Sequence, residues 1–433
     1  MDFQVFAHET RLRYQDEIIQ VMQDLIRIPT ENTPPTGAEK TGQSYVDDYL
    51  QALGLAVDNY EPTEVVGLEQ HPLYWPGRDY DNRPNVSTTL EGASGGRSLL
   101  LTGHMDTVAL GENTWSVDPF GGEIRDGRLF GLGSVDMKGA MGAMLVLVRA
   151  LVEQDIRLKG TLSYESVVDE EEAGVNATIA GRLRHGPMAA AVIPEITSLQ
   201  VYPATRGALI TDIVFSNREA TWLEVGTSDE AQADVVAQIG LLLTHLDDLR
   251  SSRRAHPVPS LYRSYHDPVP VQVTKVYAGG WGSQVPIAVP PDGKIELIVQ
   301  TLPGENREDV LQEVENWLDE LVRQYPKIFV SRPQLHFRRR WMVPTSMAAD
   351  HALVATLADS ASLVTGQPTA VLGAPYPCDL FALQQIFDMP GVVFGPAGGN
   401  AHAADEYVEL GSLFAFWESL LIFIMRWCGV EST

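Results

Sequence analysis

Apolar residues recur at helical spacing near the start of the chain. Ile18, Met22 and Leu25 stand four and three positions apart, which predicts an amphipathic helix. The pattern stops at the turn-rich segment IPTENTPPTG, and a second helical pattern then continues to Leu53. We therefore expect two helices at the start of the chain.

Short apolar runs then alternate with a helix of small residues. The runs cover residues 98–102, 161–168 and 189–193, and the helix covers residues 140–151. Strands that are buried on both faces give continuous apolar runs of this kind. The alternation predicts an α/β fold with a mixed, mostly parallel sheet flanked by helices.

The pattern changes near residue 206. Strands are predicted at residues 208–215, 269–280 and 293–304, helices at 229–249 and 307–325, and a loop at 251–270, which is rich in Pro and Ser. From residue 327 the earlier pattern returns, with a helix at 351–366, a strand at 391–396 and a last helix that ends at Trp427. We predict a large domain made of residues 1–205 and 327–433, interrupted by a smaller α+β domain at 206–326.

Composition and charge exclude several classes of protein. The 433 residues carry a formal net charge of −26, which argues against a nucleic-acid surface. No run approaches the about 18 consecutive apolar residues of a membrane helix, and the polar start MDFQVFAHET lacks the features of a secretory signal. Cys378 and Cys428 are too few for a disulfide framework or a thiolate zinc site. We expect a cytoplasmic protein with no membrane or nucleic-acid partner.

Acids and histidines gather where predicted strands give way to loops. They are His104 and Asp106 in GHMDTV, Asp136 in GLGSVDMKGA, Asp169, Glu170, Glu171 and Glu172 in VVDEEEAG, Glu195 in VIPEIT, and His402, Asp405 and Glu406 in GGNAHAADEY. The carboxyl ends of strands are where α/β sheets build their sites. Burying unpaired carboxylates there would cost several kcal/mol each, in order of magnitude, unless a cation compensates.

In combination these segments resemble a known enzyme family. HMDTV, a following W-x-x-D-P-F, GRLFGLGSVDMKGAMGAML, VVDEE, a Glu after the next strand and a late A-H-A-A-D-E are similar in order and spacing to the dinuclear zinc hydrolases. That family contains aminoacylase, acetylornithine deacetylase, succinyl-diaminopimelate desuccinylase and glutamate carboxypeptidase. The resemblance extends over most of the chain and implies a catalytic large domain with a small lid domain, through which a homodimer could form.

The resemblance also implies roles for individual residues. The metal ligands would be His104 and Glu195 at one ion, Glu171 and His402 at the other, and Asp136 bridging both. Asp106 would orient the imidazole of His104, and Glu170 would be the general base. A cis peptide bond is expected at Asp136–Met137, and Lys138 is expected to help fold that loop. Two imidazoles and three carboxylates suit two Zn²⁺ ions, with Co²⁺ or Mn²⁺ as substitutes.

The positions that handle substrate in the family are changed here. FSNREATWLEVG contains no histidine where relatives supply one for the oxyanion, Ile287 replaces an asparagine, and Gln300 replaces an arginine. The family's G-x-D-A-R stretch is also altered: Asp379 is kept, but the arginine is missing from Cys378-Asp379-Leu380-Phe381. His256, His266, Arg253, Arg254 and Arg263 could replace the missing groups, although a structural or surface role is favoured for each. The missing arginine and asparagine point away from substrates with a free carboxylate.

These observations predict a metal-dependent hydrolase of a small amide or peptide-like molecule. Hydroxide bound to two zinc ions would attack the carbonyl group, with Glu170 as base and then as acid. The substrate is expected to differ from ordinary N-acyl-α-amino acids. Two alternatives stay open, a metal-binding protein without hydrolytic activity and a biosynthetic enzyme that transfers acyl groups or forms amides.

Overall fold

The computed structural model describes residues 2–216, 220–221, 223, 234–285, 287–329, 331–337 and 339–431. The chain divides into two compact units. Unit 1 consists of Met1–Ala204, Ser346–Ala374 and Cys378–Thr433, and unit 2 of Thr205–Thr345 and Pro375–Pro377. The sequence placed the end of the insertion at residue 326, whereas unit 2 continues to Thr345. The reason is that strand β16 (Gln334–His336) pairs with strand β11 (Gly207–Ser216) of unit 2.

The elements of unit 1 follow the predicted alternation of strands and helices. Its helices are α1 (Phe3–Arg27), α2 (Lys40–Ala52), α3 (Lys138–Glu153), α4 (Asn176–His185), α8 (Ala352–Thr365) and α9 (Leu410–Cys428), with short helical turns at Pro62–Glu64 and Ala382–Ile386. Strands wholly or partly in unit 1 are β1 (Asn32–Thr33), β2 (Thr36–Gly37), β3 (Val57–Tyr60), β4 (Asn85–Leu90), β5 (Leu99–His104), β6 (Ile124–Arg125), β7 (Arg128–Phe130), β8 (Leu162–Val167), β9 (Ala191–Ile193), β10 (Val201–Thr205), β17 (Thr345–Ser346), β18 (Val371–Ala374), β19 (Gly391–Val393), β20 (Gly398–Gly399) and β21 (Tyr407–Glu409).

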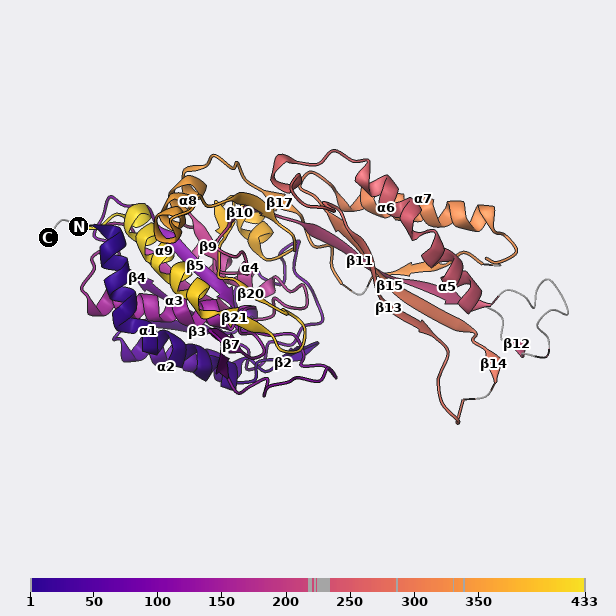
Figure 1. Ribbon diagram of the computed structural model, residues 1–433, viewed down its shortest axis with the longest axis horizontal. Helices are drawn as coiled ribbons and strands as arrows, with labels where there is room; N and C mark the ends of the chain where they lie inside the picture. The colour runs from indigo at the N-terminus through magenta and orange to yellow at the C-terminus, as the bar shows by residue number, and fades with distance from the viewer. Residues whose placement is uncertain are drawn as a thin grey trace. The chain divides into compact units, whose positions relative to one another are not determined.

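A mixed sheet forms the centre of unit 1 (Figure 1). Among the described residues it has nine strands in the order β17-β10-β19-β9-β5-β8-β4-β3, with β18 beside β10. The pairs β19–β9, β9–β5 and β5–β8 are parallel, and the flanking pairs β10–β19, β8–β4 and β4–β3 are antiparallel. All six residues of β5 are buried, which explains its continuous apolar run. The predicted α/β fold with a mixed sheet is confirmed.

Helices cover both faces of this sheet. A Cβ atom on Gly103 would lie 2.5 Å from Sδ of Met141, so one face of β5 packs closely against α3. Thr102, the preceding residue, donates a hydrogen bond to Glu165 at 3.0 Å, and Glu165 pairs with Arg182 of α4. Because successive residues of a strand point to opposite faces, α3 and α4 lie on opposite sides of the sheet.

The last helix, α9, is part of the core of unit 1. It is long and apolar enough to cross a membrane by length and composition alone. However, most of its apolar stretch is buried, and α9 packs against α1, α3 and α8. This burial inside the unit accounts for the apolar composition of the helix.

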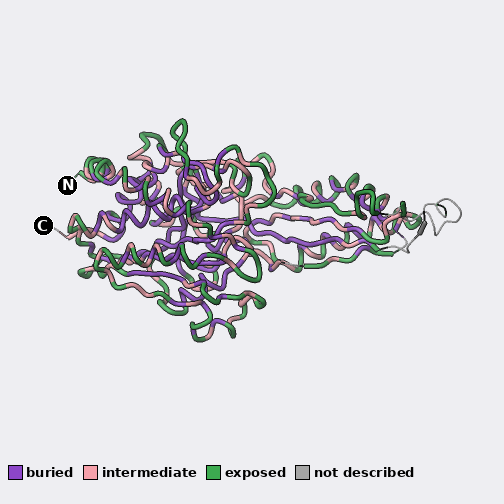
Figure 2. Tube along the Cα trace, turned by 90° about the horizontal axis from the view of Figure 1, so that it is seen from below, coloured by how far each residue is buried: buried purple, intermediate pink, exposed green. Residues whose placement is uncertain are grey.

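Unit 2 is a four-stranded antiparallel sheet with helices on one face. Within its described residues the strand order is β13-β15-β11-β16, formed by β13 (Val271–Ala278), β15 (Asp292–Thr301), β11 and β16, beside a small pair of β12 (Ala220–Thr221) and β14 (Ala288–Val289). The helices are α5 (Val235–Thr244), α6 (Leu246–Arg254) and α7 (Arg307–Gln324), with a helical turn at Ser260–Tyr262. Buried and less buried residues alternate along β15, and the buried set forms one core with α5, α6 and α7. Figure 2 shows buried residues along the central strands of each unit.

The helix predicted at residues 229–249 differs in the structure. Residues 229–233 lie outside the described part of the chain, and the remainder forms two helices, α5 and α6, which meet at His245. The segment that was predicted as a loop from residue 251 begins within α6, which continues to Arg254. Arg253 explains this difference, because its buried guanidinium group forms ion pairs that the hydrophobic pattern does not encode.

Candidate metal centre

His104 is the last residue of β5 and lies at the carboxyl end of that strand. Its side chain is buried, and its Nδ1 lies 2.9 Å from the main-chain oxygen of Asp106. If Nδ1 donates its proton to that oxygen, Nε2 is left with a lone pair. This tautomer is typical of histidines that bind metals.

Asp136 ends the glycine-rich segment GLGSVD between β7 and α3. The peptide bond between Asp136 and Met137 is cis, which confirms the expectation from the family resemblance. Nζ of the buried Lys138 donates to the main-chain oxygens of Leu25 at 3.2 Å and Ile28 at 2.7 Å. Lys138 therefore ties this loop to the end of α1, in agreement with the structural role expected for it.

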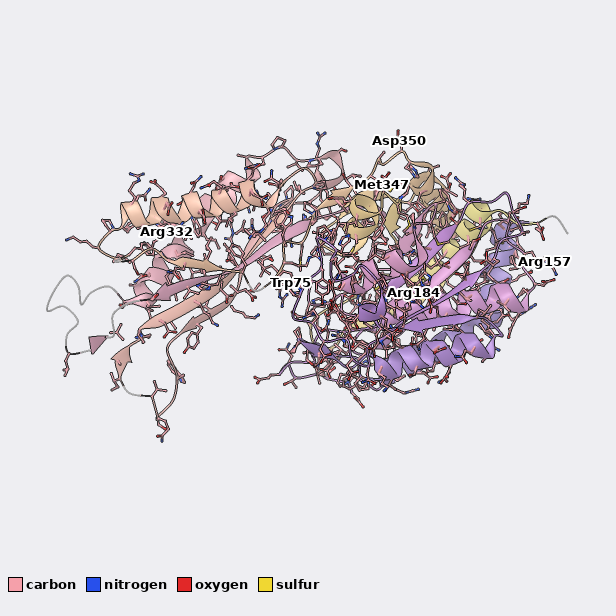
Figure 3. The ribbon with its side chains drawn as sticks, turned by 180° about the vertical axis from the view of Figure 1, so that it is seen from behind. Trp75, Arg157, Arg184, Arg332, Met347 and Asp350 are labelled. Atoms are coloured by element: carbon pink, nitrogen blue, oxygen red, sulfur yellow. The ribbon has the colours of Figure 1, made fainter. Side chains whose placement is uncertain are left out.

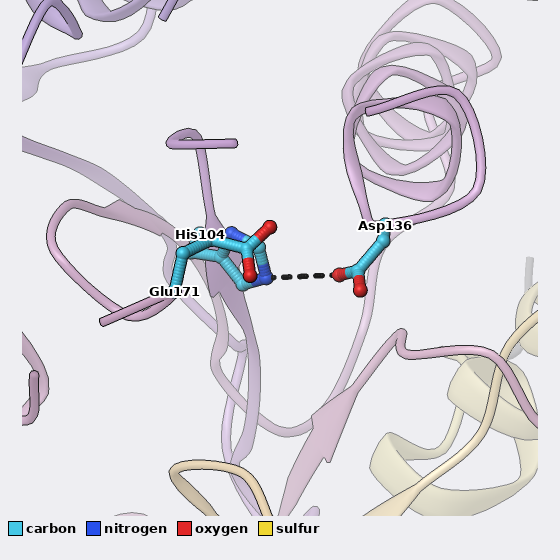
Figure 4. Close-up of side chains that lie close together, drawn as sticks. All are labelled: His104, Asp136 and Glu171. Atoms are coloured by element: carbon cyan, nitrogen blue, oxygen red, sulfur yellow. Dashed lines mark ion pairs between the residues drawn. The ribbon is translucent and has the colours of Figure 1, made fainter. Parts of the chain in front are cut away.

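The five candidate ligands lie together in the structure. Nε2 of His104 is 3.3 Å from one oxygen of Asp136 and 3.3 Å from an oxygen of Glu195. The other oxygen of Asp136 is 3.2 Å from Nε2 of His402, which is itself 2.9 Å from Glu171. Figure 4 shows three of these side chains, those of His104, Asp136 and Glu171, whose ligand atoms lie within 4.8 Å of one another.

The sheet brings most of this cluster together. His104 ends β5, Glu171 follows β8 and Glu195 follows β9, and these three strands are parallel neighbours. Their carboxyl ends therefore meet at the same edge of the sheet. His402 comes from the loop between β20 and β21, which reaches the cluster from the second, smaller sheet of unit 1.

The pKa values of the clustered side chains are shifted by burial and by their mutual charges. Burial and the charge of Asp136 raise the pKa of Glu171 and of Glu195 to about 7 each. Although burial opposes it, the contacts with Asp136 and Glu171 raise the pKa of His402 to about 11, and similar contacts raise the pKa of His104. In the chain by itself, these shifts favour protons shared between the imidazoles and the carboxylates. Bound cations would take the place of those protons.

The surroundings of one buried nitrogen atom, Nε2 of His104, indicate whether the cluster can hold a cation. Nε2 of His104 is buried without a hydrogen-bond partner among the described residues, although two carboxylate oxygens lie 3.3 Å away. An unsatisfied buried polar atom is costly, and a cation between the nitrogen and the oxygens would satisfy it. Two imidazoles and three carboxylates are a donor set that suits zinc or cobalt. The residues therefore fit divalent cations.

Asp106 links the two halves of the cluster. Its Oδ2 accepts the main-chain N–H of Glu171 at 3.0 Å and Nδ2 of Asn32 at 2.8 Å. Its Oδ1 lies 3.6 Å from Nδ1 of His104, so the imidazole is held by the main-chain oxygen of Asp106 rather than by its carboxylate. The carboxylate instead holds the loop that carries Glu171.

A buried charge network supports this arrangement, and the sequence did not reveal it. Asp169 accepts hydrogen bonds from Nε of Arg78 at 3.0 Å and from the hydroxyl group of Tyr80 at 2.6 Å, and it also contacts Arg83 at 3.4 Å. Asn32 donates to Asp169 at 3.1 Å as well as to Asp106. The two arginines in GRDYDNRPN, just before a buried strand, were the only sequence signal for these partners.

The segment that carries these arginines is fixed on α4. Main-chain atoms of Trp75 form two hydrogen bonds with the side chain of Asn176, at 2.9 and 2.8 Å. Trp75 is labelled in Figure 3. This attachment fixes the segment that brings Arg78 and Arg83 to Asp169.

Glu170 lies beside the cluster without being bound into it. Together with His104, Glu195 and Asp379 it lines a small cavity, and it forms no hydrogen bond to another described side chain. Burial raises the pKa of Glu170 well above its ordinary value, the charge of His104 opposes this rise, and Asp379 adds to it. A carboxyl group in this position can exchange a proton with a molecule in the cavity.

The structure shows the surroundings of two of the altered family positions, Gln300 and Ile287. Oε1 of Gln300, near the end of β15, accepts a hydrogen bond from Arg206 at 2.7 Å, and Ile287 is 82% exposed. The carboxylate of Asp379 accepts the hydroxyl proton of Thr178. Most of FSNREATWLEVG lies outside the described residues. The expectation that this segment lacks the family's oxyanion histidine therefore concerns a part of the chain that the structure does not describe.

The residues considered as replacements are mostly engaged elsewhere in unit 2. The buried guanidinium group of Arg253 pairs with Glu305 at 2.6 Å and Glu313 at 3.1 Å. Arg254 pairs with Asp267 at 2.7 Å, and His256 lies 3.5 Å from Glu313. Arg263 donates to the main-chain oxygen of Val258 at 3.2 Å, and His266 is exposed. These contacts agree with the structural or surface roles favoured by the sequence.

Comparison with known proteins identifies the relatives of this chain. The model of peptidase family M20/M25/M40 matches residues 100–426. An N-formyl-4-amino-5-aminomethyl-2-methylpyrimidine deformylase of Halalkalibacterium halodurans is 24% identical over 440 residues, covering 96% of each chain. A succinyl-diaminopimelate desuccinylase of Methylocella silvestris is 43% identical over 162 residues, 37% of each chain.

The fold has relatives among solved structures. The di-peptidase Dug1p of Saccharomyces cerevisiae superposes with a TM-score of 0.77 at 12% identity, covering 100% of both chains. At that identity the likeness concerns the fold alone.

Proposed function

Because the chain belongs to peptidase family M20/M25/M40, we propose that it hydrolyses the amide bond of a small N-acyl amine with the help of two divalent cations. The position of Asp136 carries this proposal. Its two carboxylate oxygens face two different histidines, His104 and His402, at 3.3 and 3.2 Å. A carboxylate with this arrangement is suited to be shared by two cations.

The proposed ligands form two sites around Asp136. His104 and Glu195 would hold one cation, and Glu171 and His402 would hold the other. We propose zinc as the ion, with Co²⁺ or Mn²⁺ as substitutes, because of the two imidazoles and three carboxylates. When bound, such cations polarise an amide carbonyl group and lower the pKa of water towards about 7.

Glu170 is the proposed general base and acid. It lines the cavity beside His104 and Glu195, and no hydrogen bond to a described residue holds its carboxylate. The raised pKa of Glu170 makes it a better acceptor for the proton of the attacking water. The same group then passes this proton to the nitrogen of the leaving amine.

The proposed substrate is an N-formyl or short N-acyl derivative of a heteroaromatic amine without a free carboxylate. Ile287 and Gln300 stand where the resembling enzymes carry asparagine and arginine, and Gln300 is engaged with Arg206. A neutral amide does not replace the bidentate contact of a guanidinium group with a carboxylate. The relative that matches 96% of this chain is named as a deformylase of an aminomethylpyrimidine, which supports the same class.

Substrate competition tests the proposal. The zinc-loaded protein is expected to release formate from N-formyl-4-amino-5-aminomethyl-2-methylpyrimidine. The kcat/KM of the protein for this N-formyl compound should exceed its kcat/KM for N-succinyl or N-acetyl amino acids by about 100-fold or more. The reverse preference would contradict the substrate class alone. No turnover of any amide by a protein with both cations bound would contradict hydrolysis and favour the non-hydrolytic alternative.

Replacing Glu170 tests its role. Glu170→Gln is expected to lower kcat by about 10²–10⁴-fold while the metal content stays at the wild-type value, because the variant cannot accept the proton. Turnover is measured with the best substrate and metal by elemental mass spectrometry. Glu112→Gln, at an exposed position in unit 1, is the control and should change neither quantity. Near-normal turnover of Glu170→Gln would remove Glu170 from the mechanism.

A further inference from the structure

Glu406 is a buried acid for which the proposed reaction has no use. Its side chain is 1% exposed, and it lies four residues after the candidate ligand His402. Burying a carboxylate is costly unless donors or a positive charge compensate. Its partners are therefore informative about its role.

Three main-chain amides from one loop supply those donors. Oε2 of Glu406 accepts the N–H of Gly133 at 2.9 Å, and Oε1 accepts the N–H of Val135 at 2.9 Å and of Asp136 at 3.1 Å. The main-chain oxygen of Glu406 accepts a further hydrogen bond, from Gly131 at 2.9 Å. Glu406 thus holds the backbone of the whole turn that ends in Asp136.

The strand pairing places Glu406 at this turn. Strand β21 pairs with β7 so that Tyr407 lies opposite Phe130. Glu406 and Gly131 are therefore the first residues beyond the end of this ladder, one on each chain segment. The segment before Glu406 carries His402, and the segment after Gly131 carries Asp136.

Glu406 consequently connects two candidate ligands that are distant in sequence. His402 and Asp136 are 3.2 Å apart in the cluster, yet each comes from a loop that the central sheet does not fix directly. A carboxylate can accept all three amide hydrogens with its two oxygens. An amide of the same shape would turn its NH₂ group towards at least one N–H donor and lose that contact.

We propose that Glu406 is a positioning residue of the metal centre: by holding the turn at Gly133–Asp136, it sets the Asp136 carboxylate against His402 for the cation that both would bind. The inference rests on the proposed function, because it presumes that Asp136 and His402 bind a cation. The Glu406 carboxylate accepts the main-chain N–H groups of that turn. Partners of this kind that orient ligands typically change metal affinity by about 10–100-fold when they are removed.

Metal titration of Glu406→Gln tests this inference. Apo-protein is titrated with Zn²⁺ against a chromophoric chelator, and the absorption spectrum of the Co²⁺-loaded protein is recorded. One of the two equivalents is expected to bind about 10–100-fold more weakly than in the wild type, with an altered Co²⁺ spectrum. Excess Zn²⁺ should restore part of the lost activity, which a purely structural defect would not allow.

Glu418→Gln is the matched control. Glu418 is also a buried glutamate of unit 1, 7% exposed, and it pairs with Arg11 at 2.8 Å. Its replacement should lower thermal stability without changing either Zn²⁺ affinity or the Co²⁺ spectrum. If Glu406→Gln does not fold, Glu406→Asp gives the same test, because it keeps the charge and withdraws the carboxylate by one methylene group.

The outcomes separate the two proposals. One outcome is that the wild type binds two equivalents of Zn²⁺ and that every Glu406 variant that folds binds them as tightly as the wild type, with an unchanged Co²⁺ spectrum. In that case Glu406 has no positioning role. If the wild type binds no Zn²⁺ or Co²⁺, the proposed function fails and the inference fails with it. Selective weakening of one equivalent in the Glu406 variants supports the inference.

Discussion

At the scale of single residues, one buried amide joins two acids that lie beside the candidate metal centre. Nδ2 of Asn32 donates to Asp106 at 2.8 Å and to Asp169 at 3.1 Å. Asp106 in turn holds the main-chain N–H of Glu171 and lies next to His104. A change at Asn32 should therefore reach both sides of the cluster without removing a ligand.

Replacing Asn32 should weaken metal binding. Asn32→Ala is expected to lower Zn²⁺ affinity by about 10–100-fold, because Asp106 and Asp169 lose the donor that fixes their spacing. The measurement is a competition titration with a chromophoric chelator. Asn59→Ala is the control, since the Asn59 side chain bonds to Asp47 at an exposed site. Equal affinities for the two variants would show that the network does not act on the ligands.

At the scale of elements, α4 carries two arginines two residues apart in opposite environments. Arg182 is buried and pairs with the equally buried Glu165 at 2.7 Å on the central strand β8. Arg184, labelled in Figure 3, is 38% exposed and pairs with Asp58 at 2.5 Å. The helix thus offers a direct comparison between a buried and an exposed ion pair.

The buried pair should dominate the stability of this element. Arg182→Met is expected to lower the free energy of unfolding by about 3–5 kcal/mol, because it leaves Glu165 charged and buried. Arg184→Met should cost less than about 1 kcal/mol, because solvent screens its pair. Urea unfolding at neutral pH measures both. A cost for Arg184→Met equal to that for Arg182→Met would contradict the assigned environments.

The exposed pair of Arg184 and Asp58 also predicts how the stability of the protein depends on pH. Hydrogen bonds from Arg184 hold the pKa of Asp58 below its usual range, and burial opposes them only in part. Because the folded pKa is lower than the unfolded one, the pair stabilises the protein above the unfolded pKa of about 4. This contribution is lost as the pH falls through the folded pKa. The difference between Arg184→Met and the wild type should therefore shrink towards acid pH, and a difference that grows there would contradict it.

At the scale of the whole molecule, all of the candidate ligands belong to one unit. The five ligands and Glu170 lie in unit 1, whereas unit 2 has its own core of residues from β11, β13, β15, α5, α6 and α7. A ligand that binds only the folded state stabilises the unit that it binds. Metal should therefore act on unit 1.

Metal removal tests this difference between the units. Chelation is expected to lower the unfolding temperature of unit 1, by the equivalent of about 4 kcal/mol if the metal was present at 1,000 times its Kd. The transition of unit 2 should not move. Differential scanning calorimetry with and without EDTA measures both transitions, and His402→Ala should reduce the effect of EDTA. A shift confined to unit 2 would contradict the assignment of the ligands.

The sequence by itself predicted most of the elements of unit 1 and supplied the candidate ligands. Buried parallel strands have a local signature of continuous apolar residues, and Glu171 and Glu195 come shortly after such runs. Residue type alone makes His104, Asp136 and His402 possible ligands. Their roles came from the resemblance of the combined motifs to the dinuclear zinc hydrolases. For these features, neighbours in the sequence carry the information.

Only the tertiary structure decided which buried charges compensate one another. Arg78 and Asp169 are 91 positions apart, and Glu406 meets Gly133 across 273 positions. Such pairs form because burial makes an isolated charge costly, and the cost is met by whichever donor the fold brings near. The extension of unit 2 to Thr345 has the same origin, since the pairing of β16 with β11 leaves no local pattern. Local periodicity therefore predicts elements, whereas the partners of buried polar groups depend on the completed fold.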